Sequence, residues 1–222
     1  MLPPERGARS AAHLARVCRP RPRRRRPRTR GPSPSSRGNH LVLTVDLAPS
    51  EASPTGVWYV DTGLGDALHD PLPLVSGTHR QRPFDLTLEG SPDGTRWHLV
   101  HDPRGGFKGM TWDMAEAGLD DFAQQHQRLS TSPESGFVQV PMAERRDATG
   151  VDVVRGLLMS RIGEGARSEA VTDRDAWFDA LAQLFGLRLD RLEPEARDRL
   201  WTSAAAAHQR WLEEQGSRDT EA

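Results

Sequence analysis

Apolar and polar residues alternate along the segment HLVLTVDL, residues 40–47. One face of this segment carries Leu41, Leu43, Val45 and Leu47, and the other carries His40, Val42, Thr44 and Asp46. A period of two residues places successive side chains on opposite faces of an extended chain. The segment is therefore predicted to be a half-buried β-strand.

Further strands follow at short intervals. The turn-rich stretch APSEASPTG leads into VWYVD, residues 57–61, which is predicted to return alongside the first strand. Phe84–Glu89 and Arg96–His101 flank the segment SPDGT, in which Pro-Asp-Gly favours a tight turn. These patterns predict an antiparallel β-barrel or sheet domain over residues 40–115.

The second half of the chain mixes helices with strands, which gives an α+β fold overall. Residues 119–127 are predicted to form a short helix, ended by the Ser-Thr-Ser-Pro that follows, and residues 137–140 and 151–162 are predicted to be strands. The sequence therefore predicts an α/β lid domain over residues 116–222.

Two helices are predicted to close this second domain. Thr172 and Asp175 have the spacing of a capping box, and the apolar stripe of Trp177, Leu181 and Leu184 follows. Gly186 comes after this stripe and is a typical C-terminal cap. The last helix is predicted over residues 194–211, with proline in its first turn.

Charge is divided unevenly along the chain. Residues 1–39 contain 12 Arg and one Glu, whereas the rest holds 18 basic and 30 acidic side chains. The stretch RPRPRRRRPRTRGPSPSSRG has almost nothing apolar to bury, so it cannot offset the entropy of becoming ordered. A basic arm on an acidic body can also bind nucleic acid, but this one lacks the aromatic residues on which bases stack. We expect residues 1–39 to be disordered and to have no nucleic-acid partner.

Composition limits the remaining classes. No apolar run approaches the roughly 20 residues that cross a bilayer, and no signal-peptide core is visible; a cytoplasmic protein without a membrane partner is expected. Cys18 is the only cysteine, which excludes an intrachain disulfide and a cysteine-based metal cluster. Five further histidines lack the spacing of metal ligands, so we expect no metal and expect them to be exposed. They are His69, His79, His98, His101 and His126.

His40 and Asp61 are the strongest candidates for chemistry. An antiparallel hairpin returns the second strand beside the first, so Asp61 can lie near His40. A carboxylate that accepts one imidazole N–H sets the tautomer and leaves the other nitrogen to act as a base. A structural hydrogen bond is the ordinary alternative for such a pair. Glycines 63 and 65 after Asp61 make a sharp turn that exposes the end of the strand.

Four segments resemble arylamine N-acetyltransferases in the same order: GNHLVLTVDL, WYVDTGLGD, PLPL and QRLSTSPESGF. The family's histidine lies in a His-x-x-Leu-x-Val strand, matched by His40, Leu43 and Val45. Its aspartate lies in a Val-Asp-x-Gly-Phe-Gly turn, matched by Val60, Asp61, Gly63 and Gly65, with Leu64 in place of Phe. The resemblance covers residues 40–189.

This resemblance implies a two-step acyl transfer. A cysteine thiolate, paired with His40 and oriented by Asp61, takes acetyl from acetyl-CoA, and an arylamine or hydrazine then collects it. Acetyl-CoA is a substrate, and no bound cofactor is implied. The macrolactam-forming amide synthases of the same family are an alternative, and so is a non-catalytic, CoA-binding relative.

The family's cysteine belongs to an Arg-Gly-Gly-x-Cys motif in a helical domain that precedes the histidine. This sequence contains no such motif before His40, so the chain is expected to be a truncated or altered member. Arg-Val-Cys18-Arg-Pro does not match the motif, although neighbouring arginines would favour a thiolate. The similar Arg104-Gly-Gly-Phe-Lys108 follows both His40 and Asp61, and it is predicted to be a surface turn.

The resemblance also implies where the substrates bind. Gly63 and Leu64 would contact the amine acceptor. The hydroxyl-rich stretch from Ser130 to Ser135 would border the CoA cleft, where hydroxyl groups suit phosphate or pantetheine contacts. The residues implied there are Ser130, Thr131, Ser132 and Ser135; a capped turn is the structural alternative.

Overall fold

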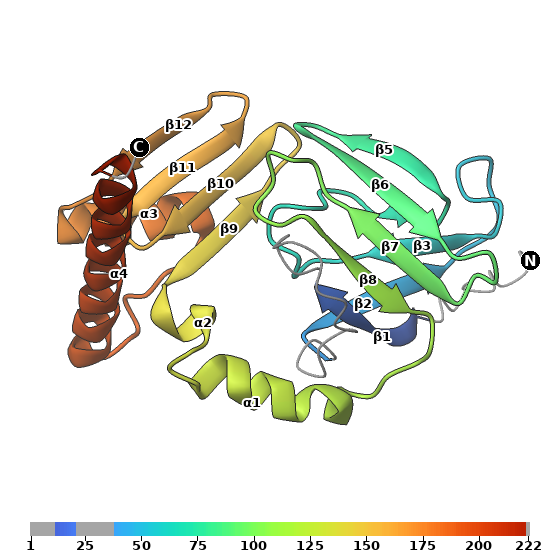
Figure 1. Cartoon of the computed structure of the whole chain (residues 1–222), viewed down its shortest axis with the longest axis horizontal. Helices are drawn as coiled ribbons and strands as arrows, with labels where there is room; N and C mark the ends of the chain where they lie inside the picture. Colours follow the sequence, from blue (N-terminus) through green and yellow to red (C-terminus); the bar gives the residue numbers. More distant parts are fainter. Residues whose placement is uncertain (1–11, 21–37, 221–222) are drawn as a thin grey trace, which may run out of the picture.

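The computed structural model describes residues 12–20 and 38–220. Two antiparallel sheets lie side by side, and helix α1, Ala123–Thr131, runs below them on the path from the larger sheet to the smaller (Figure 1). The part of the chain before α1 forms the larger sheet and the part after it forms the smaller. None of the described helices is long and apolar enough to cross a membrane.

The larger sheet has eight strands in the order β4-β3-β2-β1-β8-β7-β6-β5. Its strands are β1 Ala12–Pro20, β2 His40–Asp46, β3 Val57–Val60, β4 Leu72–Pro73, β5 Gly77–Gln81, β6 Phe84–Gly90, β7 Arg96–Val100 and β8 Gly109–Asp113. The predicted strands at residues 40–47, 57–61, 84–89 and 96–101 are confirmed. The sheet is open, with β4 and β5 as its edges, so the antiparallel sheet is confirmed and a closed barrel is wrong.

Strand β1 lies within the segment predicted to be disordered. It pairs antiparallel with β2 on one side and with β8 on the other. Composition indicates only how much apolar area a segment can bury, whereas β1 is held by backbone hydrogen bonds to the strands on both sides of it. Disorder is therefore wrong for residues 12–20, and the rest of the predicted arm lies outside the described residues apart from Gly38 and Asn39.

The buried face of β2 is the more polar one. Val42 and Thr44 are buried, whereas Leu41 and Leu43 are half-buried and Leu47 is exposed. Val42 joins a core that contains Tyr59 and the large side chains of β6–β8, among them Phe84 and Trp112. Leu41 and Leu43, on the other face, line the cleft described below, as does His40 at the start of the strand.

The smaller sheet has the order β12-β11-β10-β9. Its strands are β9 Met142–Arg146, β10 Gly150–Arg155, β11 Leu158–Gly163 and β12 Arg167–Ala170. The predicted segment 151–162 is confirmed as two strands, which turn at Gly156. The predicted strand at 137–140 is wrong: Gly136–Gln139 is a short helix, α2, because the Ser135 Oγ caps it by accepting from the Phe137 N–H.

Helices α3, Arg174–Phe185, and α4, Pro194–Thr220, pack against this sheet. Their core contains Trp177, whose Nε1 donates to the Gly156 carbonyl at 3.0 Å. Gly186 ends α3 in the left-handed conformation, as predicted. The predicted helix at 119–127 is present as a 3-10 turn, Leu119–Phe122, that continues into α1, and α4 extends beyond its predicted end at Trp211.

The N-cap of α3 is Asp173 rather than Thr172, because the Asp173 Oδ1 accepts from the Ala176 N–H at 2.8 Å. Asp173→Ala is expected to lower the free energy of unfolding by about 1 kcal/mol. Thr172→Ala is the matched control and should have a much smaller effect. Urea unfolding monitored by circular dichroism measures both, and equal losses would contradict the assignment.

Candidate active site

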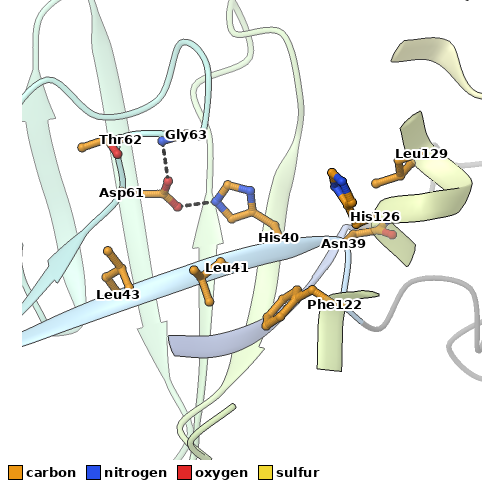
Figure 2. Close-up of a pocket in the computed structure, with 11 residues that line it drawn as sticks. Asn39, His40, Leu41, Leu43, Asp61, Thr62, Gly63, Phe122, His126 and Leu129 are labelled. Carbon is orange, nitrogen blue, oxygen red and sulfur yellow. Dashed lines mark hydrogen bonds and ion pairs between the residues drawn. The ribbon is translucent and has the colours of Figure 1, made fainter. Parts of the chain in front are cut away.

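His40 begins β2, and Asp61 directly follows β3, the neighbouring antiparallel strand. The His40 Nε2 lies 2.5 Å from the Asp61 Oδ2 (Figure 2). The Asp61 side chain is only 2% exposed, whereas that of His40 is 22% exposed. The carboxylate is thus sealed behind the imidazole, and the imidazole remains accessible.

Asp61 is held by two further donors. The Tyr59 hydroxyl donates to Oδ2 at 3.0 Å, and the Gly63 N–H donates to Oδ1 at 3.0 Å. Both carboxylate oxygens therefore have fixed directions, and the bond to Nε2 fixes the ring of His40. The second ring nitrogen, Nδ1, is left to take or give a proton.

The pair opens on a cleft of about 380 Å³. The start of β2 and the turn after Asp61 form one wall, and Phe122, His126 and Leu129 of the helical segment form the other (Figure 2). Leu41 and Leu43 also line the cleft, which makes the surface around His40 partly apolar. A Gln125 side chain amide that donates to the Asn39 Oδ1 ties α1 to the start of β2.

Only one of the two predicted acceptor-binding residues lies in this cleft. Gly63 lines it, and its N–H serves Asp61. A Cβ at Gly63 would lie 3.8 Å from the His40 Cε1, an ordinary contact, so close approach does not require glycine there. Leu64 is not among the lining residues and packs against the core of the larger sheet instead.

The hydroxyl-rich stretch lies at the end of α1, outside the lining of the cleft. Its hydroxyls are engaged with nearby backbone. Ser130 donates to the His126 carbonyl, Thr131 to that of Gln127 and Ser135 to that of Leu129, while the Ser132 Oγ accepts from the Glu134 N–H. The role of these four residues in CoA binding stays a prediction.

Cys18 has a position that the sequence did not indicate. In the register of β1 and β2, the backbone of Cys18 is paired with that of His40. The only cysteine of the chain therefore belongs to the strand next to the candidate base.

A second group of ionisable side chains was missed by the sequence analysis. The His101 Nε2 lies 3.3 Å from the Asp66 Oδ1, and both side chains are almost fully buried. The Gly106 N–H donates to the Asp66 Oδ2 at 2.6 Å. The carboxyl group of Glu144, from β9, lies next to Gly65 and Gly106. We call the buried pair Asp66 and His101, together with the half-buried Glu144 beside them, the buried triad.

The expectation that the histidines would be exposed is wrong for His98 and His101, which are buried. For His101, the signal in the sequence was the glycine pair in Arg104-Gly-Gly-Phe-Lys108. A Cβ at Gly105 would lie 2.1 Å from the His101 ring, so the buried imidazole requires glycine at this position. Phe107 packs edge-on against the same ring. Within the described residues, no group of three or more His, Cys, Asp or Glu side chains is placed to hold a metal ion.

Burial affects the two carboxyls of the buried triad differently. Burial raises the pKa of Glu144 to about 7, and the negative charge of Asp66 adds to this effect. Burial also raises the pKa of Asp66, but His101 and the Gly106 N–H outweigh it and lower that pKa below its usual value. Asp66 is therefore the ionised member, and Glu144 takes up a proton near neutral pH.

A carboxylate–imidazole pair at the mouth of a partly apolar cleft is able to activate a nucleophile that lies beside the imidazole. The N-acetyltransferase family model matches residues 25–193, and the chain belongs to this family. The comparison with curated proteins finds no match.

Solved arylamine N-acetyltransferases have the same fold. The Mycobacterium smegmatis protein is 21% identical, with a TM-score of 0.69 over 89% of this chain and 69% of that one. The Mycobacterium marinum protein in complex with CoA is 20% identical, with a TM-score of 0.68 over 87% and 68%. The Nocardia farcinica protein is 24% identical, with a TM-score of 0.62 over 88% and 65%. The chain spans about two thirds of the length of these proteins.

The raised pKa of Glu144 makes stability depend on pH. In the unfolded chain this carboxyl has its ordinary pKa of 4.5, against about 7 in the fold. The folded state holds the proton more tightly, so the stability from this group is fully present below about pH 4.5 and is lost as pH rises from there through about 7. Glu144→Gln should match the wild type near about pH 4 and be more stable by about 1–3 kcal/mol above about pH 8, because Glu144 is only half-buried and solvent screens part of its charge.

Urea unfolding at the two pH values measures this difference. Glu169→Gln on the exposed edge strand β12 is the control and should show no pH-dependent gain. A gain for Glu144→Gln of equal size at both pH values would contradict the assignment.

Proposed function

We propose that this protein transfers an acetyl group from acetyl-CoA to an arylamine or hydrazine by way of a thiol activated by His40. The observation that carries the proposal is the His40–Asp61 pair, with a buried carboxylate held by three donors and an imidazole facing the cleft. The family membership and the CoA complex of the M. marinum neighbour support acetyl-CoA as the donor.

In the first step, the Nδ1 of His40 takes the proton of the thiol, and the thiolate attacks the acetyl carbonyl. The thioester bond to CoA breaks, and CoA leaves as its thiol with the proton from His40. In the second step, the amine attacks the new thioester, the amide forms, and the thiol is restored. Asp61 stabilises the imidazolium in both steps because its carboxylate is fixed at the Nε2 side of the ring.

The backbone register makes Cys18 the candidate for this thiol. The residues around Cys18 do not match the family's cysteine motif, so the sequence alone did not favour it. The pairing of its backbone with that of His40 supports Cys18 in this role. The partly apolar wall from Leu41, Leu43 and Phe122 suits the aromatic ring of an arylamine.

Intact mass spectrometry after incubation with acetyl-CoA tests the thiol. We expect a single acetyl adduct on the wild type that disappears in Cys18→Ser. An adduct that persists in Cys18→Ser would contradict the role of Cys18. A wild type that binds CoA without forming an adduct would overturn transfer by this chain and leave a non-catalytic CoA-binding protein.

The role of the pair is tested by His40→Gln and Asp61→Asn. Each is expected to slow formation of the adduct by about 10²–10⁴-fold, because the first removes the base and the second removes the charge that orients and stabilises it. The exposed His69–Asp70 pair, with 2.9 Å between the His69 Nδ1 and the Asp70 Oδ2, gives a matched control. His69→Gln should leave the rate unchanged, and an equal loss in all three variants would contradict a specific role for His40.

A further inference from the structure

The loop Asp61–Asp66 is held at both ends by a carboxylate next to an imidazole. Asp61 bonds to His40 at one end, and Asp66 contacts His101 at the other. The two carboxylates are almost equally buried, at 2% and 3% exposure. The loop is therefore fixed at both of its ends by a buried carboxylate.

Glu144 reaches this loop from the smaller sheet. A Cβ at Gly65 would lie 2.0 Å from the Glu144 Oε2, and Gly65 has a positive φ of 61°. The left-handed backbone favours glycine at this position, and a side chain there would force the end of the Glu144 side chain to move. On the other side, a Cβ at Gly106 would lie 3.8 Å from the Glu144 Oε1. Glu144 thus lies between the loop that carries Asp61 and the glycine-rich loop that binds Asp66.

We propose that the buried triad positions the Asp61 loop, so that the charge on Glu144 in the smaller sheet alters how Asp61 is presented to His40. The positioning itself does not depend on acetyl transfer, but its consequence for catalysis rests on the proposed function. None of these three residues lines the cleft. They are therefore positioning residues, which act on Asp61 through the loop.

The charges around Glu144 explain how such coupling arises. Asp66 opposes ionisation of Glu144, whereas His101, which follows β7, and Arg155 of β10 favour it. Two carboxylates this close cannot both carry a charge without cost. Once Glu144 loses its proton, it repels Asp66, and Gly65 and Gly63 lie on the short path from Asp66 to Asp61.

The Gly63 N–H is a direct reporter, because it donates to the Asp61 Oδ1. The Gly106 N–H reports on Asp66 in the same way. We compare both amide signals in ¹⁵N–¹H NMR spectra of wild type and Glu144→Gln, at about pH 5.5 and about pH 8.5, on either side of the pKa of Glu144. Comparing the variants at each pH removes the changes that the two proteins share.

The expected result is that the Gly63 and Gly106 signals of the two proteins nearly coincide at the lower pH and separate at the higher one. Glu169→Gln should follow the wild type at both pH values. Asp66→Asn, which keeps the side-chain shape but removes the charge, should displace the Gly63 signal at both pH values. Circular dichroism confirms that each variant is folded.

Two outcomes would overturn the proposal. If Gly106 responds and Gly63 does not, the triad acts only on its own end of the loop. If the variants differ equally at both pH values, Gln acts by shape and the charge of Glu144 has no influence. None of these measurements needs acetyl transfer, so an intact NMR response in a chain that forms no acetyl adduct would count against the proposed function alone.

Discussion

The carboxylate of Asp61 is almost wholly removed from water, and a buried charge is tolerated only where hydrogen bonds replace its hydration. Tyr59, Gly63 and His40 supply these bonds from within β3, from the following turn and from β2. The pairing of β2 with β3 and the turn after Asp61 must therefore be correct before the carboxylate can be buried. This arrangement buries the carboxylate and leaves the imidazole accessible from the cleft.

Three His–Asp pairs among the described residues show why burial determines what such a pair can do. His69–Asp70 is on the surface, where solvent weakens the interaction. His101–Asp66 is sealed in the interior, where no substrate reaches it. In His40–Asp61 the acid is buried and the base is open to a cleft. Only the third environment combines a fixed, desolvated carboxylate with an accessible nitrogen.

The buried triad gives the glycine-rich segment after β7 a structural meaning. Its resemblance to a cysteine motif comes from Gly105 and Gly106; the His101 ring explains Gly105, and the Gly106 N–H donates to Asp66. The same contacts join the two sheets, because Glu144 belongs to β9 and the other two side chains belong to loops of the larger sheet. Val151 of β10, which is buried in the core of the larger sheet, strengthens this junction.

Local sequence determined much of this protein: the alternation that makes β2, the turn between β6 and β7, the αL cap at Gly186, and the His40 and Asp61 motifs. Each depends on residues close together in the chain, so its physical cause can be read directly. Composition was a poor guide to β1, because its hydrogen bonds come from strands distant in the sequence. Tertiary structure alone decided that the valine and threonine face of β2 is buried, that Cys18 is paired with His40, and that Glu144 meets Asp66. These features arise from packing between segments that are distant in the sequence. Burial at such contacts determines which side chains keep their charge.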